Sequence, residues 1–317
     1  MSGSSLRIAF FGTPEFAVPT LQALLEARHE VVAVVSQPDR PKGRGHKLQP
    51  TPTKMTAAES GATVLQPERI RNDEFLRQVA EMQLDLGVVA AYGRILPESL
   101  LRLPRLGMIN VHASLLPEYR GAAPVHRAVI DGRTETGVTI MRVVRELDAG
   151  PMMATTGVAI GPDETSVEIE RKLAHLGAPL LLSVVDALAA GVAQEIPQDD
   201  SRATFAPKIV KSEGAIDWEL PASRIHNLVR GLHPWPLVSA WIDGHRYLIH
   251  RTRRTSERSA MGGGIIVTTE GGRVGVATSD GEVLNIIAIQ PEGRRVMTAR
   301  EFLAGHPLPV GARLRSA

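Results

Sequence analysis

The chain has 317 residues, of which 43% are hydrophobic and 22% charged, and these fractions exclude a fibre and a wholly disordered chain. It contains no cysteine, which excludes disulfides, thiolate metal sites and a cysteine nucleophile and fits a reducing compartment. The N-terminus lacks the basic and apolar segments of an export signal, and no uninterrupted apolar run approaches the roughly 18 residues of a membrane span. We therefore expect a cytoplasmic protein of two domains without a membrane.

The net charge of +2 is unevenly distributed along the chain. Residues 1–206 hold 21 Lys and Arg against 24 Asp and Glu, a balance of −3, whereas residues 207–317 hold 15 against 10, a balance of +5. A basic last part suggests contact with a polyanion, although ordinary solvated surface explains five excess charges equally well.

The first forty residues predict a β-α-β unit. Residues 6–12 and 30–37 are short apolar runs, and residues 15–27 between them carry apolar positions at helical spacing. Such a unit builds a parallel, doubly wound sheet of the Rossmann-like α/β class. Gly12 stands alone at the first turn, without the G-x-G-x-x-G fingerprint, so a nicotinamide dinucleotide is a poor candidate ligand.

The same alternation continues to about residue 190 and then stops. Residues 85–93, 108–112, 137–144 and 152–160 read as further strands, and residues 72–83, 97–103, 125–132 and 165–190 read as helices. Residues 191–207 are polar, bounded by proline and without periodicity, as in a linker. We therefore predict a first domain over residues 1–190 and a second over 208–317, where short alternating runs with glycine turns favour a small β-barrel.

Residues 37–54 read as an exposed basic loop. They carry four prolines, two glycines and six basic residues against one acidic residue, with almost nothing apolar to anchor them. The spacing of a triphosphate-binding loop is missing. The segment is either a solvated surface loop or an arm that orders against a phosphate backbone.

Asn110 and His112 are the strongest candidates for catalysis. They follow an apolar run two positions apart, and alternate residues of a strand share a face, so the amide and the imidazole should lie together at the carboxyl end of a strand. Imidazole has an ordinary pKa of about 6.5 and exchanges protons at neutral pH, and an amide NH₂ can donate to a developing oxyanion. Asp148, in a later sharp loop, could orient the imidazole. This pattern suits acyl transfer, and a structural histidine is the alternative.

Two other chemistries fit the sequence poorly. His112, His126 and Asp148 do not form a local metal-binding pair, so we expect no metal. Ser114 lacks the G-x-S-x-G context of a hydrolase nucleophile.

The sequence resembles a known family at several motifs. NVH at residues 110–112, SLLP at 114–117, RGAAP at 120–124 and ELDAGPM at 146–152 resemble the formyltransferases that use 10-formyltetrahydrofolate. FFGTPEFAVPTL at residues 10–21 and QPDRPKGRG at residues 37–45 are similar to the methionyl-tRNA formyltransferase family in particular. The resemblance runs from about Leu6 to Leu314.

The resemblance implies a set of roles. It implies that Asn110, His112 and Asp148 are catalytic and that the second domain is an OB-like barrel that binds tRNA. The donor would be 10-formyltetrahydrofolate, the acceptor initiator methionyl-tRNA, and the enzyme a cytoplasmic monomer. The folate site would comprise Ser114, Leu115, Leu116 and Pro117 together with Ala91, Tyr92, Gly93 and Ile95, the last group contributing mainly backbone. The tRNA contacts would include Arg44, Lys42, Arg40 and Lys47.

Other functions compete with this interpretation. An enzyme on the same scaffold could formylate a small amine, such as an amino sugar nucleotide or glycinamide ribonucleotide, but would have no use for the basic loop. A non-catalytic RNA-binding protein would have no reason to hold Asn110, His112 and Asp148 together. A dehydrogenase is disfavoured by the missing glycine fingerprint.

Overall fold

The computed structural model describes residues 4–42 and 47–316, and it gives only the backbone of Lys42 and Lys47. The chain divides into two compact units that interleave along the sequence. Unit 1 comprises Met1–Gly121, Thr136–Val158 and Glu170–Phe205, and unit 2 comprises Ala122–Glu135, Ala159–Ile169 and Ala206–Ala317. The predicted boundary at residues 191–207 stays a prediction.

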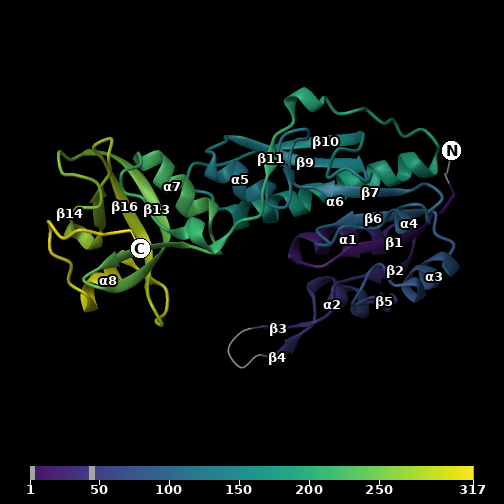
Figure 1. The fold of residues 1–317 in the computed structure, drawn as a ribbon, viewed down its shortest axis with the longest axis horizontal. Coiled ribbons are helices and arrows are strands. Elements are labelled where there is room, and N and C mark those ends of the chain that lie inside the picture. Colours follow the sequence, from purple (N-terminus) through teal and green to yellow (C-terminus); the bar gives the residue numbers. More distant parts are fainter. Residues whose placement is uncertain (1–3, 43–46, 317) are drawn as a thin grey trace. The chain divides into compact units, whose positions relative to one another are not determined.

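Unit 1 is built on a seven-stranded sheet of order β10-β9-β7-β6-β1-β2-β5, which Figure 1 shows side by side. Its strands are β1 (Arg7–Gly12), β2 (Glu30–Val35), β5 (Val64–Leu65), β6 (Leu86–Ala90), β7 (Met108–His112), β9 (Glu135–Arg142) and β10 (Met152–Ala159). The five strands from β7 to β5 are parallel, which confirms the Rossmann-like α/β class. β9 runs antiparallel to β7, so the sheet is mixed at this side, which the sequence did not predict.

Helices join and cover the strands of unit 1. They are α1 (Val18–Glu26), α2 (Pro52–Glu59), α3 (Asp73–Glu81), α4 (Glu98–Leu101) and α6 (Ser166–Ala189), with 3-10 turns η1 (Glu15–Ala17) and η2 (Asp200–Arg202). In α6, a Cβ added at Gly177 would lie 3.1 Å from Val111 of β7 and 3.5 Å from Val138 of β9. The absence of a side chain there lets α6 lie directly on these two strands, so the residues of β7 that alternate with Val111 face the other way.

By length and apolar content, α6 is the one helix in the described ranges that could cross a membrane. Its apolar residues include the fully buried Leu173, Leu181 and Val185. A core helix of a folded domain has the same composition, so α6 is explained by its place on the sheet.

The basic segment 37–54 is more ordered at both ends than we predicted. β3 (Arg40–Lys42) and β4 (Lys47–Gln49) pair antiparallel, and α2 begins at Pro52. The prediction of a loop as far as residue 54 was therefore wrong. The missed signal is Thr51-Pro52, because the threonine side chain accepts a hydrogen bond from the backbone N–H of Lys54 (3.3 Å) and proline suits the first helical position.

Unit 2 contains an antiparallel sheet of order β12-β13-β16-β15-β14, with β17 paired to β16. Its elements are α5 (Pro124–Ile130), η3 (Lys211–Gly214), α7 (Ala222–Gly231), β12 (Val238–Ile242), β13 (His245–Arg258), β14 (Ile266–Thr268), η4 (Glu270–Gly272), β15 (Val274–Ala277), β16 (Glu282–Pro291), β17 (Met297–Thr298) and α8 (Ala299–Gly305). The chain end bridges the two edges of this sheet, because Arg315 pairs with Trp241 of β12 and Arg313 pairs with Ile265 beside β14. This closure agrees with the predicted OB-like barrel.

Candidate active site

β7 brings Asn110 and His112 to the carboxyl end of the parallel strands. Asn110 lies between Val89 of β6 and Met141 of β9, in the interior of the sheet. Neighbouring strands on both sides fix the backbone here, and the alternation of the strand places the two polar side chains on one face. The sequence prediction that these residues lie together at a strand end is met by this geometry.

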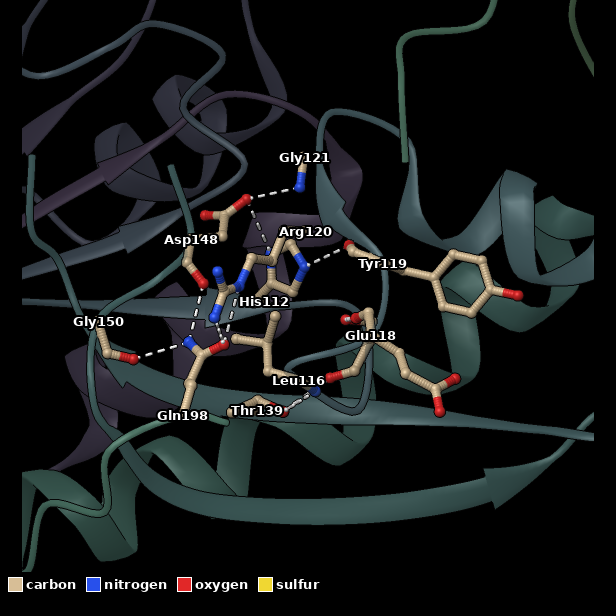
Figure 2. A network of polar contacts seen from close by, with 11 residues as sticks. His112, Leu116, Glu118, Tyr119, Arg120, Gly121, Thr139, Asp148, Gly150 and Gln198 are labelled. Atoms are coloured by element: carbon tan, nitrogen blue, oxygen red, sulfur yellow. Dashed lines mark hydrogen bonds and ion pairs between the residues drawn. The ribbon is translucent and has the colours of Figure 1, made fainter. Parts of the chain in front are cut away.

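The His112 ring is 5% exposed and is bounded by two oxygen acceptors (Figure 2). Its Nε2 lies 3.0 Å from the carbonyl oxygen of Tyr119, and its Nδ1 lies 3.7 Å from Oδ2 of Asp148. The second distance exceeds a hydrogen bond but is within reach of an ion pair. A neutral imidazole has one N–H, so only the doubly protonated ring can satisfy both acceptors.

Asp148 reaches the ring from the loop between β9 and β10. Its Oδ2 accepts a hydrogen bond from the backbone N–H of Gly121 at 2.8 Å. Its backbone has φ 50°, in the left-handed region that costs a residue with a Cβ of order 1 kcal/mol. The surroundings therefore impose this conformation on the loop, and they do so where the carboxylate meets the imidazole.

The amide of Asn110 is available for a ligand. The side chain is half-buried, and within residues 4–42 and 47–316 it makes no hydrogen bond. An amide that is held in a sheet and has no partner can donate to an oxygen that arrives next to His112.

The segment Ser114–Pro117 is fastened to β9. Thr139 Oγ1 donates to the carbonyl oxygen of Ser114 (2.7 Å) and accepts from the backbone N–H of Leu116 (3.2 Å), as Figure 2 shows in part. The Ser114 hydroxyl donates to the carbonyl oxygen of Glu118 at 2.6 Å. Ser114, Leu116 and Pro117 are buried, and Leu115 is half-buried. Any contact of this segment with a ligand is therefore confined to a small exposed part of its surface.

The predicted folate residues after β6 differ in exposure. Ala91 and Gly93 are exposed and form a tight turn with φ 47° and 79°. The side chain of Ile95 is 76% exposed, so it offers apolar surface. Tyr92 is 1% exposed, and its ring packs edge-on against Phe11 with centroids 5.8 Å apart.

Tyr92 is therefore a core residue whose phenol cannot reach a ligand. Burial raises the pKa of its hydroxyl, partly offset by the charge of Arg94. Its carbonyl oxygen already accepts hydrogen bonds from the side chains of Thr13 (3.1 Å) and Gln37 (2.8 Å). The backbone of its two neighbours is the part of this turn that is open.

Three of the four predicted tRNA residues, Arg40, Lys42 and Lys47, belong to the paired strands β3 and β4. Arg40 is exposed, and its Nη2 donates to Oε1 of Gln37 at 3.3 Å. Lys42 pairs with Lys47 in the register of the two strands, at the end of the pair that adjoins residues 43–46. Arg44 lies outside the described residues.

Two polar residues near the site were missed by the sequence interpretation. Arg120 is 6% exposed and donates to Oε1 of Gln198 from Nε (3.0 Å) and Nη2 (2.8 Å). Gln198 lies in the segment that we assigned to a linker, where a single glutamine carries no recognisable signal. In the described ranges no three His, Asp or Glu residues come together as metal ligands.

Comparison with known proteins decides the family. The formyl transferase family model matches residues 6–185, and the model of the formyl transferase C-terminal domain matches residues 208–307. Methionyl-tRNA formyltransferases from Pelobacter propionicus and Moorella thermoacetica are each 45% identical, over 99% and 96% of this chain and 98% of their own lengths. The chain belongs to the methionyl-tRNA formyltransferase family. The recognition made from its motifs is confirmed.

Solved structures with this fold include more distant proteins. An N-formyltransferase from Helicobacter canadensis, in complex with folinic acid and dTDP-3-aminofucose, has a TM-score of 0.69 at 16% identity, over 90% of this chain and 99% of that one. HypX from Aquifex aeolicus, in complex with tetrahydrofolic acid, has a TM-score of 0.65 at 17% identity, over 95% of this chain but 47% of its own. At 16% and 17% identity, the likeness of these two structures to this chain establishes the fold alone.

Proposed function

We propose that this protein transfers the formyl group of 10-formyltetrahydrofolate to the α-amino group of methionyl-tRNA, giving N-formylmethionyl-tRNA for translation initiation. The observation that carries the proposal is the arrangement of the free Asn110 amide, the His112 imidazole and the Asp148 carboxylate at the end of β7. Relatives named methionyl-tRNA formyltransferase, 44% to 46% identical over nearly the whole chain, support the choice of acceptor.

The reaction needs a proton acceptor and an oxyanion donor. A free α-amino group has a pKa of about 7.7 to 8.0, so a large fraction is neutral near pH 7.5 and can attack the formyl carbon. The Asn110 NH₂ then donates to the oxygen that becomes negative. His112 Nε2 takes the proton that the amine loses and returns a proton to N10 of the folate as the carbon–N10 bond breaks. The products are the formylated amine and tetrahydrofolate.

The surroundings of His112 suit this proton cycle. When the ring is doubly protonated, Nδ1–H faces the Asp148 carboxylate and Nε2–H can bond to the carbonyl oxygen of Tyr119. The Asp148 carboxylate stabilises the charged ring that forms as the amine adds. Nε2 must leave Tyr119 to receive the proton, so substrate binding has to displace this hydrogen bond.

The turn after β6 fits the pterin end of the formyl donor. The exposed backbone of Ala91 and Gly93 offers hydrogen-bond donors and acceptors to the pterin. The exposed Ile95 side chain offers apolar surface against which a flat ring can pack. Ser114–Pro117 would hold the adjoining part of the donor near His112. The carbonyl of Tyr92 is not available to it, because Thr13 and Gln37 already occupy it.

The acceptor is chosen by other parts of the chain. Arg44 would engage the acceptor end of the tRNA with Lys42, Arg40 and Lys47 around it, and residues 208–317 would add basic surface. A role in translation places the protein in the cytoplasm, and we propose that it acts as a monomer.

A formylation assay with 10-formyltetrahydrofolate tests this function. We expect rapid formylation of initiator methionyl-tRNA, slower formylation of elongator methionyl-tRNA and negligible formylation of free methionine. Preference for an amino sugar nucleotide would identify the small-amine alternative. Binding of tRNA without formylation of any acceptor would identify the non-catalytic alternative.

A further inference from the structure

One side chain fastens the backbone that directly follows the Asp148 carboxylate in the chain. The NH₂ of Gln198 donates to the carbonyl oxygen of Asp148 (2.8 Å) and to that of Gly150 (2.7 Å), and Figure 2 shows both bonds. Two carbonyls of one turn are thereby held from a single point. A turn with a left-handed non-glycine residue needs such external bonds, because its local conformation is unfavourable.

Gln198 is itself held in one orientation. Its Oε1 accepts two hydrogen bonds from the buried Arg120, whose Nη2 also donates to Oδ1 of Asp200 at 2.6 Å. All the donors of the amide are used, and an arginine fork fixes the acceptor end. Reversing the amide would place NH₂ against the guanidinium, so the network allows one arrangement only.

The dipeptide Arg120-Gly121 supports both the carboxylate and the backbone of Asp148. Gly121 N–H donates to Oδ2 of Asp148, while the preceding residue, Arg120, acts on the Asp148 backbone through Gln198. The position of the carboxylate relative to His112 therefore depends on two supports. The one through Gly121 is direct, and the one through Gln198 fixes the turn that carries the carboxylate.

The same part of the chain also supports the other acceptor of the His112 ring. Thr204 Oγ1 accepts from the backbone N–H of Tyr119 at 2.9 Å, and Tyr119 presents its carbonyl oxygen to His112. Residues 198–204, which the sequence marks as a linker, thus contact the catalytic loops at two points.

We propose that Gln198 is a positioning residue for formyl transfer, which acts by holding the Asp148 turn so that the carboxylate faces His112. The predicted fall in kcat rests on the proposed function. The predicted loosening of the Asp148 turn does not. Displacement of a catalytic group by about 1 Å can slow an enzyme about 100-fold, so loss of the two bonds should lower kcat by about 10- to 100-fold. The KM values for donor and tRNA should stay within about threefold, because Gln198 is not among the residues that we assign to either substrate.

A double-mutant cycle tests the route through Asp148. Gln198→Ala removes the whole support, and Gln198→Glu keeps an acceptor for Arg120 but removes both donors to the turn. Each should lower kcat in the wild type and have less than about a threefold effect when Asp148 is already Asn. Gln194→Ala, an exposed amide in the same segment, should leave kcat unchanged. Equal effects of the Gln198 variants in both backgrounds would overturn the proposal.

Hydrogen exchange gives a readout that does not depend on activity. The Gly121 N–H that bonds to Asp148 should exchange at least about fivefold faster in Gln198→Glu than in Gln194→Ala at equal melting temperature. Unchanged exchange would overturn the proposal even if the rate falls. An inactive wild-type protein would refute the proposed function instead, and the exchange comparison would still decide the role of Gln198.

Discussion

The end of β7 and the hairpin of β3 and β4 differ in how far their polar residues are buried and hydrogen-bonded. At the end of β7, His112 is 5% exposed, and Asp148 accepts a hydrogen bond from the backbone N–H of Gly121. Gln198, which accepts hydrogen bonds from Arg120, donates to the backbone of the Asp148 turn. On the hairpin, Arg40 is exposed, and its Nη2 donates a long hydrogen bond of 3.3 Å to the nearby Gln37.

The difference matches the two tasks that we assign to these regions. Proton transfer requires fixed distances, so its residues are buried and braced by hydrogen bonds. Recognition of a phosphate backbone relies on charge presented to solvent, so its residues need exposure more than fixed geometry. The comparison predicts that changes at the end of β7 will affect the chemical step and that changes on the hairpin will affect tRNA affinity.

The largest effect should follow from His112→Ala. Loss of the proton acceptor should lower kcat about 10³- to 10⁴-fold with little change in tRNA affinity. Steady-state formylation of methionyl-tRNA and a filter-binding assay measure the two quantities. Normal kcat in this variant would remove His112 from the mechanism.

Asn110→Ala should have the next largest effect. Loss of one oxyanion donor lowers kcat by about 10²- to 10³-fold in other acyl-transfer enzymes, and the Asn110 amide makes no hydrogen bond within the described part of the chain that the variant would lose. The variant should therefore melt near the wild-type temperature. A large drop in melting temperature with intact kcat would make Asn110 a structural residue.

Arg44→Ala should affect the tRNA and spare the folate. We expect a rise of about 10-fold in the KM for methionyl-tRNA and no change in the KM for 10-formyltetrahydrofolate, since one phosphate contact is lost. The dependence of tRNA affinity on salt should become shallower. Arg77→Ala, an exposed arginine of α3, serves as the matched control, and equal effects of the two variants would deny Arg44 a specific role.

The smallest effect concerns the stability of the fold at low pH. It should depend neither on the end of β7 nor on the hairpin of β3 and β4. Burial alone would raise the pKa of Glu168, but hydrogen bonds from Thr165 and Arg251 outweigh it and lower the pKa to about 2. Because the folded pKa lies below that of the unfolded chain, Glu168 stabilises the fold above about pH 4.5 and loses this contribution as the pH falls towards 2.

The unfolding midpoint in urea should therefore fall less between about pH 5 and pH 3 in Glu168→Gln than in the wild type. Glu170 is a matched control in the same helix, because burial raises the pKa of its carboxyl. Because the folded pKa of Glu170 lies above that of the unfolded chain, its protonation stabilises the fold as the pH falls, so Glu170→Gln should lose stability with acid at least as steeply as the wild type. An identical decline in all three proteins would show that Glu168 makes no such contribution.

The sequence predicted most of the fold because the apolar periodicity of unit 1 is strong. β7 and its pair of polar residues follow from alternation, and α6 follows from helical spacing. The antiparallel direction of β9 could not be predicted, because strand direction depends on tertiary pairing. The start of α2 was predictable from Thr51-Pro52 but was missed.

The candidate site was predictable only where residue types carry chemistry. Asn110, His112 and Asp148 stand out by type, spacing and resemblance. Gln198 does not, because its role comes from lying opposite the Asp148 turn, 50 residues away in sequence. Tyr92 is the opposite case. The resemblance placed it in the folate site, but its side chain lies in the core.

The division of labour between the two regions is tested most directly by single-turnover formylation at saturating methionyl-tRNA, with wild type, His112→Ala and Arg44→Ala compared side by side. Our account predicts a rate about 10³-fold below wild type for His112→Ala and close to wild type for Arg44→Ala. A slow Arg44→Ala protein beside a fast His112→Ala protein would contradict it.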